Sequence, residues 1–226
     1  MVKSFISLFY PNICFTCNNA LLYNEKIICT KCILQLPKTN FHKEKDNPVN
    51  TLFWGRINIE AATALYFYNK KIKIQKLLHN LKYKNKPEIG VFLGKLLGNE
   101  IKDISPYNNC DIIIPVPLHK KRIKTRGYNQ SAMIAQGLSE VLKIEYNDNI
   151  LKRTVYTKTQ TYKNKEKRWL NVKDAFNFNE KINIEGKNIL LVDDVITTGA
   201  TLEACAKLLL NQNCKVSIVS LAFVKI

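Results

Sequence analysis

The stretch ILLVDDVITTGAT, residues 189–201, joins a short apolar run to two adjacent aspartates and a threonine-rich turn. The apolar run NILLV predicts a buried strand that ends near Asp193, and we expect the next helix to begin near Thr201. A loop that enters a helix offers unpaired backbone N–H groups and the positive end of the helix dipole. The stretch therefore predicts a strand, an anion-binding turn and a helix in direct succession.

The turn and the two acids together favour a sugar phosphate as the ligand. Asp193 and Asp194 would repel a bare phosphate, but carboxylates accept hydrogen bonds from vicinal hydroxyls or hold magnesium through water. Glycine in the turn lets the backbone approach a ligand closely. The residues predicted to cradle the phosphate are Thr197, Thr198, Gly199, Ala200 and Thr201. The competing interpretation is that the aspartates only cap a strand end and the threonines are ordinary turn formers.

The chain beyond residue 58 alternates between strand patterns and helix patterns. Strands are expected at residues 61–68, 111–117, 188–192 and 215–224. Helices are expected around the apolar stripe of residues 74–81 and at 89–101, 129–143 and 201–213, although glycines weaken the second of these. This order predicts an α/β fold in which helices flank a mostly parallel sheet. Ligands of such sheets bind beyond the carboxyl ends of the strands.

A cysteine-rich segment precedes the sheet region. Cys14, Cys17, Cys29 and Cys32 form two C-x2-C pairs separated by 11 residues. Four thiolates at this spacing predict a closed, structural zinc site, whereas a redox pair or plain buried cysteines are the alternatives. We therefore expect a zinc ribbon at residues 1–40, a polar linker at 41–58, and the sheet domain at 59–226.

Composition limits the classes of partner. The chain has 226 residues with 35 Lys+Arg against 18 Asp+Glu, a formal charge of +17, which attracts phosphates on nucleic acids or metabolites. A general abundance of lysine is the alternative explanation. No apolar run reaches the roughly 18 residues of a spanning helix, and the beginning of the chain does not resemble a signal peptide. The expected location is the cytoplasm.

These motifs resemble those of a known family. The stretch ILLVDDVITTGAT resembles the phosphoribosyl pyrophosphate (PRPP) signature of type I phosphoribosyltransferases. The whole order resembles the ComF family of competence-associated proteins: the four-cysteine knuckle, PVPLHKKRIKTRGYNQS, RTVYTKTQTYKNKEKRWLNVKDAF and then the signature. The resemblance covers nearly the entire chain, and RGYNQ after PVPLH narrows it to ComF.

The resemblance implies a role for each matching residue. Asp193 and Asp194 would contact the ribose hydroxyls, and residues 197–201 would hold the 5′-phosphate. Pro117, Leu118 and His119 would form a pyrophosphate loop. Residues 153–171 would form a mobile loop whose cations, including Arg153 and Arg168, suit a pyrophosphate.

Two functional hypotheses follow, one for an enzyme and one for a binding factor. The first is a phosphoribosyltransferase, or a PRPP- or nucleotide-binding relative, in which magnesium neutralises the pyrophosphate that a nitrogen nucleophile displaces. No histidine is expected to act as the base, His119 being the one candidate. A glutamine amidotransferase is not expected, because the first cysteine, Cys14, lies within the metal knuckle.

The second hypothesis is a non-catalytic factor in natural transformation. It would handle single-stranded DNA or dock onto a DNA-uptake or helicase partner, and the family resemblance points to this role. The charge of +17 is compatible with it, as are aromatic residues that lie among cations. Those aromatic residues are Tyr128, Tyr156, Tyr162 and Trp169. The acceptor base, catalytic turnover and oligomeric state stay open.

Overall fold

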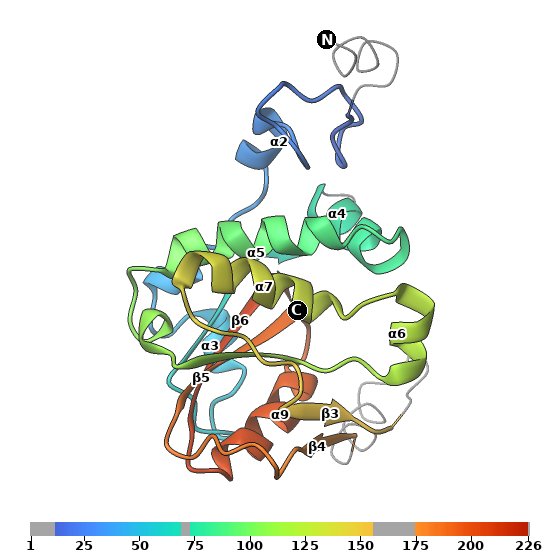
Figure 1. The fold of residues 1–226 in the computed structure, drawn as a ribbon. Helices are drawn as coiled ribbons and strands as arrows, with labels where there is room; N and C mark the ends of the chain where they lie inside the picture. The colour runs from blue at the N-terminus through green and yellow to red at the C-terminus, as the bar shows by residue number, and fades with distance from the viewer. Residues whose placement is uncertain (1–11, 69–72, 156–174, 226) are drawn as a thin grey trace.

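A four-stranded parallel sheet forms the centre of the protein. The computed structural model describes residues 12–68, 73–155 and 175–225 (Figure 1). The sheet contains β1 (Ala61–Tyr68), β2 (Ile112–Pro115), β5 (Asn188–Ile196) and β6 (Lys215–Val224), in the order β1-β6-β5-β2. Val192 of β5 lies opposite Pro115 of β2 and Val219 of β6, so the carboxyl ends of these strands share one edge. The predicted mostly parallel α/β sheet is therefore confirmed.

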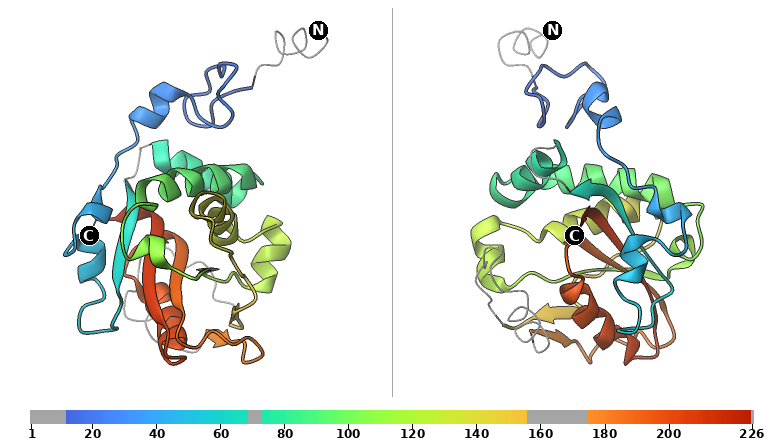
Figure 2. Two further views of the ribbon diagram at one scale, coloured as in Figure 1. Left: turned by 60° about the vertical axis from the view of Figure 1, so that its left-hand side comes forward. Right: turned by 180° about the vertical axis from the view of Figure 1, so that it is seen from behind.

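Helices cover both faces of the sheet (Figures 1 and 2). One face carries α4 (Lys73–Tyr83), α5 (Pro87–Ile101) and α7 (Gln130–Leu142), and α9 (Ala200–Leu210) lies on the other. Alternate residues of β5 pack into the two hydrophobic cores, one on each face of the sheet. Leu190 and Val192 pack with the first group of helices, whereas Ile189 and Leu191 pack with α9.

The contact between α5 and α7 explains the glycines that weakened the helix prediction. A Cβ atom at Gly94 would overlap the carbonyl oxygen of Ile134 on α7. A Cβ atom at Gly137 would overlap the carbonyl oxygen of Val91 on α5. The glycines therefore allow the two backbones to approach closely, and this packing offsets the low helix propensity of glycine.

Strand β5 runs further than the sequence predicts. It ends at Ile196, where the sequence pattern places its end near Asp193. The reason is its neighbour, because Val195 and Ile196 still pair with Ala222 and Phe223 of β6. Both aspartates of the signature consequently lie within the strand, which holds their backbones in place. Helix α9 begins at Ala200, one residue before the expected start.

Several short elements were not predicted. They are α2 (Thr30–Leu34), η1 (Phe41–Lys43), α3 (Pro48–Thr51), η2 (Tyr107–Asn109), α6 (Lys120–Arg126), and the antiparallel pair β3 (Leu151–Arg153) and β4 (Phe176–Phe178). Among the described residues, no helix is long and apolar enough to cross a membrane.

The segment predicted as a linker, residues 41–58, packs against the sheet. Its side chains Phe41, Val49 and Phe53 are buried in the core on the α9 side. Asn47 joins the segment to β1, because its side-chain amide donates a hydrogen bond to the carbonyl of Ala62 at 2.9 Å. These residues were not predicted to pack against the sheet, because the segment is polar overall and its few apolar residues are too irregularly spaced to form a recognisable pattern.

Candidate functional site

Two acidic side chains lie at the carboxyl edge of the sheet. Asp193 accepts hydrogen bonds from the Ser131 hydroxyl at 3.1 Å and from the backbone N–H of Asp194 at 2.8 Å. Burial, together with the charge of Asp194, raises the pKa of Asp193 to about 7. This carboxyl group can therefore change its protonation state near neutral pH.

Asp194 forms an ion pair with Lys82, which the sequence did not reveal. The Lys82 ammonium nitrogen lies 3.0 Å from Oδ1 and 2.9 Å from Oδ2 of Asp194. Burial lowers the pKa of Lys82, but the charge of Asp194, the hydrogen bond to Asp194 and the charge of Asp193 together outweigh burial and raise the pKa overall. The lysine is in the last turn of α4, 112 positions from its partner, and no local pattern connects the two residues.

The RGYNQS motif holds three elements together at the acid pair. Tyr128 donates a hydrogen bond through its hydroxyl to the carbonyl of Leu81 in α4. Asn129 caps α7 and donates to the carbonyl of Val116 at 3.0 Å. Ser131 then donates to Asp193. Tyr128 is half-buried in this contact, so the structure gives it a packing role. The other aromatic residues proposed for stacking, Tyr156, Tyr162 and Trp169, lie outside the described residues.

The predicted phosphate turn follows directly after β5. Gly199 is the N-cap of α9 with a φ of 75°, a left-handed conformation that favours glycine. No side chain caps the helix there, so its first N–H groups remain available to an anion. Thr197, Thr198, Ala200 and Thr201 are all half-buried around this turn. An uncapped helix terminus of this geometry suits an anion.

The segment of residues 41–58 packs against the turn and supports it. A Cβ atom at Gly199 would lie 3.1 Å from Cε1 of Phe53. Arg56 donates to the carbonyl of Thr198 at 3.1 Å and forms an ion pair with Glu203 in the first turn of α9. Phe53 and Arg56 therefore fix the position of the turn, and neither has a local sequence signal.

The loop after β2 lies beside the acid pair, because the Val116 N–H donates to the carbonyl of Val192 at 2.8 Å. Pro117 is buried, and Leu118 and His119 are half-buried. His119 is the N-cap of α6, and its Nδ1 accepts from the Lys121 N–H at 3.1 Å.

Arg153, in β3, is the one predicted loop cation within the described part of the chain. Its guanidinium group lies 5.1 Å from the centre of the Phe176 ring. Burial and the nearby Arg122 lower the pKa of Arg153, whereas the charge of Asp193 acts in the opposite direction. Arg153 is therefore close enough to the acid pair to interact with it electrostatically. Arg168 lies outside the described residues.

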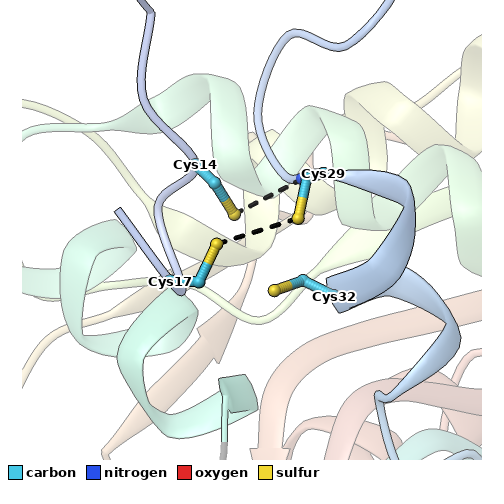
Figure 3. Close-up of side chains that lie close together, drawn as sticks. All are labelled: Cys14, Cys17, Cys29 and Cys32. Atoms are coloured by element: carbon cyan, nitrogen blue, oxygen red, sulfur yellow. Dashed lines mark hydrogen bonds between the residues drawn. The ribbon is translucent and has the colours of Figure 1, made fainter. Parts of the chain in front are cut away.

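The four knuckle cysteines converge on one point (Figure 3). The sulfur atoms of Cys14, Cys17, Cys29 and Cys32 all lie within 4.8 Å of one another, and those of Cys17 and Cys29 are 3.8 Å apart. A tetrahedral zinc ion with Zn–S bonds of about 2.3 Å requires sulfurs roughly 3.8 Å apart. The cluster therefore fits a structural metal and forms the small N-terminal knuckle of the zinc-ribbon type.

Hydrogen bonds at two of the four cysteines favour the form that binds a metal. Burial raises the pKa of Cys14, but hydrogen bonds from the backbone N–H of Cys17 and from the Thr16 hydroxyl outweigh it and lower the pKa to about 6. Lys73 of α4 donates to the sulfur of Cys32 at 3.1 Å. Both effects favour the thiolate, which is the form that binds zinc, at Cys14 and Cys32. At Cys29, a hydrogen bond from the backbone of Cys32 lowers the pKa, but burial and side-chain hydrogen bonds with the other three cysteines outweigh it and raise the pKa to about 12.

The chain is similar to known proteins over most of its length. The phosphoribosyl transferase domain family matches residues 128–225. DNA utilization protein YhgH of Shigella flexneri is 31% identical over 214 residues, which cover 91% of this chain and 87% of that protein. Competence protein F of Haemophilus influenzae is 38% identical over 59% of this chain and 60% of its own length. A hypoxanthine phosphoribosyltransferase from Staphylococcus aureus aligns with a TM-score of 0.41 at 18% identity, over 61% of this chain and 64% of that chain.

The sheet, the turn after β5 and the domain match define a protein with a phosphoribosyltransferase-type fold. The similar proteins and the N-terminal four-cysteine knuckle identify one family within this class. The chain belongs to the ComF family, which includes competence protein ComFC of Bacillus subtilis, 27% identical over 94% of this chain and 84% of its own length.

Proposed function

We propose that this protein binds PRPP, or a nucleotide built on the same ribose 5-phosphate, at the carboxyl edge of its sheet. The uncapped N-terminus of α9 would hold the 5′-phosphate, and Asp193 and Asp194 would accept hydrogen bonds from the ribose hydroxyls. The protein would act in the cytoplasm in the handling of incoming DNA, the process suggested by the names of its relatives, "DNA utilization protein" and "Competence protein".

A single observation carries this proposal. Five residues, 195–199, separate Asp194 from Ala200, the first residue of α9, and they comprise only the end of β5 and the turn. A ribose 5-phosphate has its vicinal hydroxyls and its phosphate separated by a few bonds, so one molecule can reach both groups. The buried Phe53 and the half-buried Arg56 keep the turn in position for such a ligand.

Magnesium would enter with the ligand. Carboxylate oxygens suit this ion, but both oxygens of Asp194 already contact Lys82. The residues present therefore fit a magnesium ion carried on the pyrophosphate oxygens better than one bound directly by the acid pair. When bound, the ion would neutralise charge on the pyrophosphate.

A specific surface favours a second candidate function, the binding of single-stranded DNA. Helix α6 has five basic residues, no acidic residue and no buried side chain, so it contributes little to the core. The guanidinium group of Arg126, the last residue of α6, lies 5.2 Å from the centre of the Tyr83 ring, and Tyr83 is 58% exposed. Cations next to an exposed aromatic ring suit phosphates and a stacked base. The same surface could receive a DNA-uptake or helicase partner that delivers the strand.

Calorimetric titration of the zinc-loaded protein tests both candidates. We expect saturable PRPP binding that depends on magnesium, and its loss in the double variant Asp193→Asn/Asp194→Asn. The matched control is Asp103→Asn/Asp148→Asn, which removes the same charge from two exposed positions. Unchanged PRPP affinity in the first variant would contradict the role of the acids.

A short single-stranded oligonucleotide is titrated in parallel at moderate salt. Binding of the oligonucleotide without binding of PRPP would show that the fold serves DNA and that the turn is only a scaffold. Binding of both, with PRPP changing the affinity for the oligonucleotide, would mean that the ligand regulates DNA handling.

A further inference from the structure

The ammonium group of Lys82 occupies a fixed position at the acid pair. Its neighbour Leu81 is fully buried, and the Leu81 carbonyl accepts the hydrogen bond of Tyr128, so the end of α4 is anchored on two sides. From there Lys82 contacts both oxygens of Asp194, while its side chain remains 24% exposed. A ligand that reaches Asp194 must therefore also meet this ammonium group.

The sheet separates Lys82 from the phosphate turn. Helix α4 lies on the face that also carries α5 and α7, whereas the turn leads into α9 on the opposite face (Figure 1). A ribose that lies across the end of β5, with its 5′-phosphate at α9, has its C1 end directed toward α4. The C2 hydroxyl bound by an acid is adjacent to C1, so an ammonium group on that acid lies beside the C1 substituent.

A second cation lies on the same side. Arg126 of α6 reaches the last turn of α4, where its guanidinium group lies 5.2 Å from the centre of the Tyr83 ring, and it donates to Oε1 of Gln130 at 2.9 Å. Asp194 can neutralise one of the two cations. The side of the site next to α4 therefore suits a multiply charged anionic group, which guanidinium and ammonium donors bind well.

We propose that Lys82 contacts the anionic group at C1 of the ribose and determines that the site prefers PRPP over a ribose 5-phosphate without that group. This inference rests on the proposed function and names a ligand-contacting residue for it. Lys82 is held on Asp194 in this structure. In the complex, its ammonium group is shared between Asp194 and the pyrophosphate, while the ribose hydroxyls take the remaining acceptor positions of the acids.

The test compares two probes that differ only at C1, PRPP and ribose 5-phosphate, by ligand-observed NMR titration, which measures weak binding. Lys82→Met should weaken PRPP binding by about tenfold or more, the loss of one charge-assisted contact, and change ribose 5-phosphate binding by less than about twofold. Lys82→Arg should retain the preference for PRPP. The control is Lys95→Met, which removes a lysine from the exposed ion pair with Glu140.

The outcomes separate the inference from the proposed function. Equal losses for both probes would mean that Lys82 only positions Asp194, and unchanged binding would mean that it contacts neither ligand; either result overturns the inference. If the wild-type protein binds neither probe, the proposed function itself fails. If Lys82→Met does not fold because Asp194 is left unpaired, Asp194→Asn is compared with Lys82→Met/Asp194→Asn, and the selective loss for PRPP should appear between these two.

Discussion

At the scale of single residues, the titration of Asp193 should change the stability of the fold and the affinity for PRPP in opposite directions as the pH rises. Its pKa is raised from 3.8 to about 7 in the folded protein by burial and by Asp194. The protonated carboxyl therefore favours the folded state, and this contribution is lost as the pH rises through about 7. The groups that face it are Asp194 of β5, Lys82 of α4, Ser131 of α7, Arg153 of β3 and Cys205 of α9.

The affinity for PRPP should increase as the pH rises, whereas the stabilising contribution of Asp193 decreases. The ribose hydroxyls need the carboxylate as acceptor, so PRPP binding should release a proton near pH 6 to 7. We expect affinity to be about tenfold weaker at pH 6 than at pH 8, since roughly a tenth of a group with a pKa near 7 is ionised at pH 6. Calorimetry in buffers of different ionisation enthalpy measures the proton release.

Asp193→Asn provides the control for that pH dependence. PRPP has a phosphate of its own that titrates near pH 6, and this ligand contribution persists in the variant. The part of the pH dependence that belongs to Asp193 should disappear in Asp193→Asn. An identical pH profile in the wild-type protein and the variant would show that Asp193 binds no ligand in the carboxylate form.

At the scale of elements, the turn between β5 and α9 depends on its support by residues 41–58. Gly199→Ala should destabilise the protein by about 2–3 kcal/mol, because a left-handed backbone and a contact with Phe53 both oppose a Cβ atom. It should also weaken PRPP binding, because the N–H groups of the turn are displaced. Denaturant unfolding and calorimetry measure the two effects.

Gly186→Ala is the matched comparison for the turn. Gly186 has a φ of 72°, but a Cβ atom there meets nothing within 4 Å. We expect it to cost about 1 kcal/mol through the backbone alone and to leave PRPP affinity unchanged. Phe53→Leu combined with Gly199→Ala should recover part of the lost stability. Equal effects of the two alanine variants would show that Phe53 does not hold the turn.

The elements also show how far the sequence predicts this site. Local signals found the strand before Asp193, the glycine of the turn and the cysteine pairs, because each depends on neighbouring residues. Lys82 and Arg56 escaped prediction, since each contacts a residue more than a hundred positions away. The end of β5 was misplaced because its last pairs depend on β6 and not on its own composition.

At the scale of the whole molecule, the cysteine knuckle and the ligand site share helix α4. Lys76 of α4 donates to the carbonyl of Thr16 at 2.7 Å, and Asn80 donates to that of Phe15 at 3.3 Å. The buried knuckle residues Cys14, Ile28 and Cys32 belong to the same core cluster as the inner face of α4. The last turn of α4 also carries Lys82 and its ion pair with Asp194, so one helix contacts both sites.

Removal of the metal should therefore also change the stability of α4 and the affinity for PRPP. The simplest expectation from the sequence is that chelation unfolds the first 40 or so residues and spares the sheet domain. The shared core adds α4 to the affected region, so hydrogen exchange should rise in residues 12–36 and in Lys73–Tyr83 while β5 and β6 remain protected. PRPP affinity should fall by at least about fivefold, a typical coupling between distant sites. Lys76→Met, which weakens the knuckle contact without touching a cysteine, should reproduce part of this loss in the zinc-loaded protein. Unaltered exchange in α4 after chelation would show that the knuckle folds as an independent unit, and global loss of protection would show that the sheet itself depends on the metal.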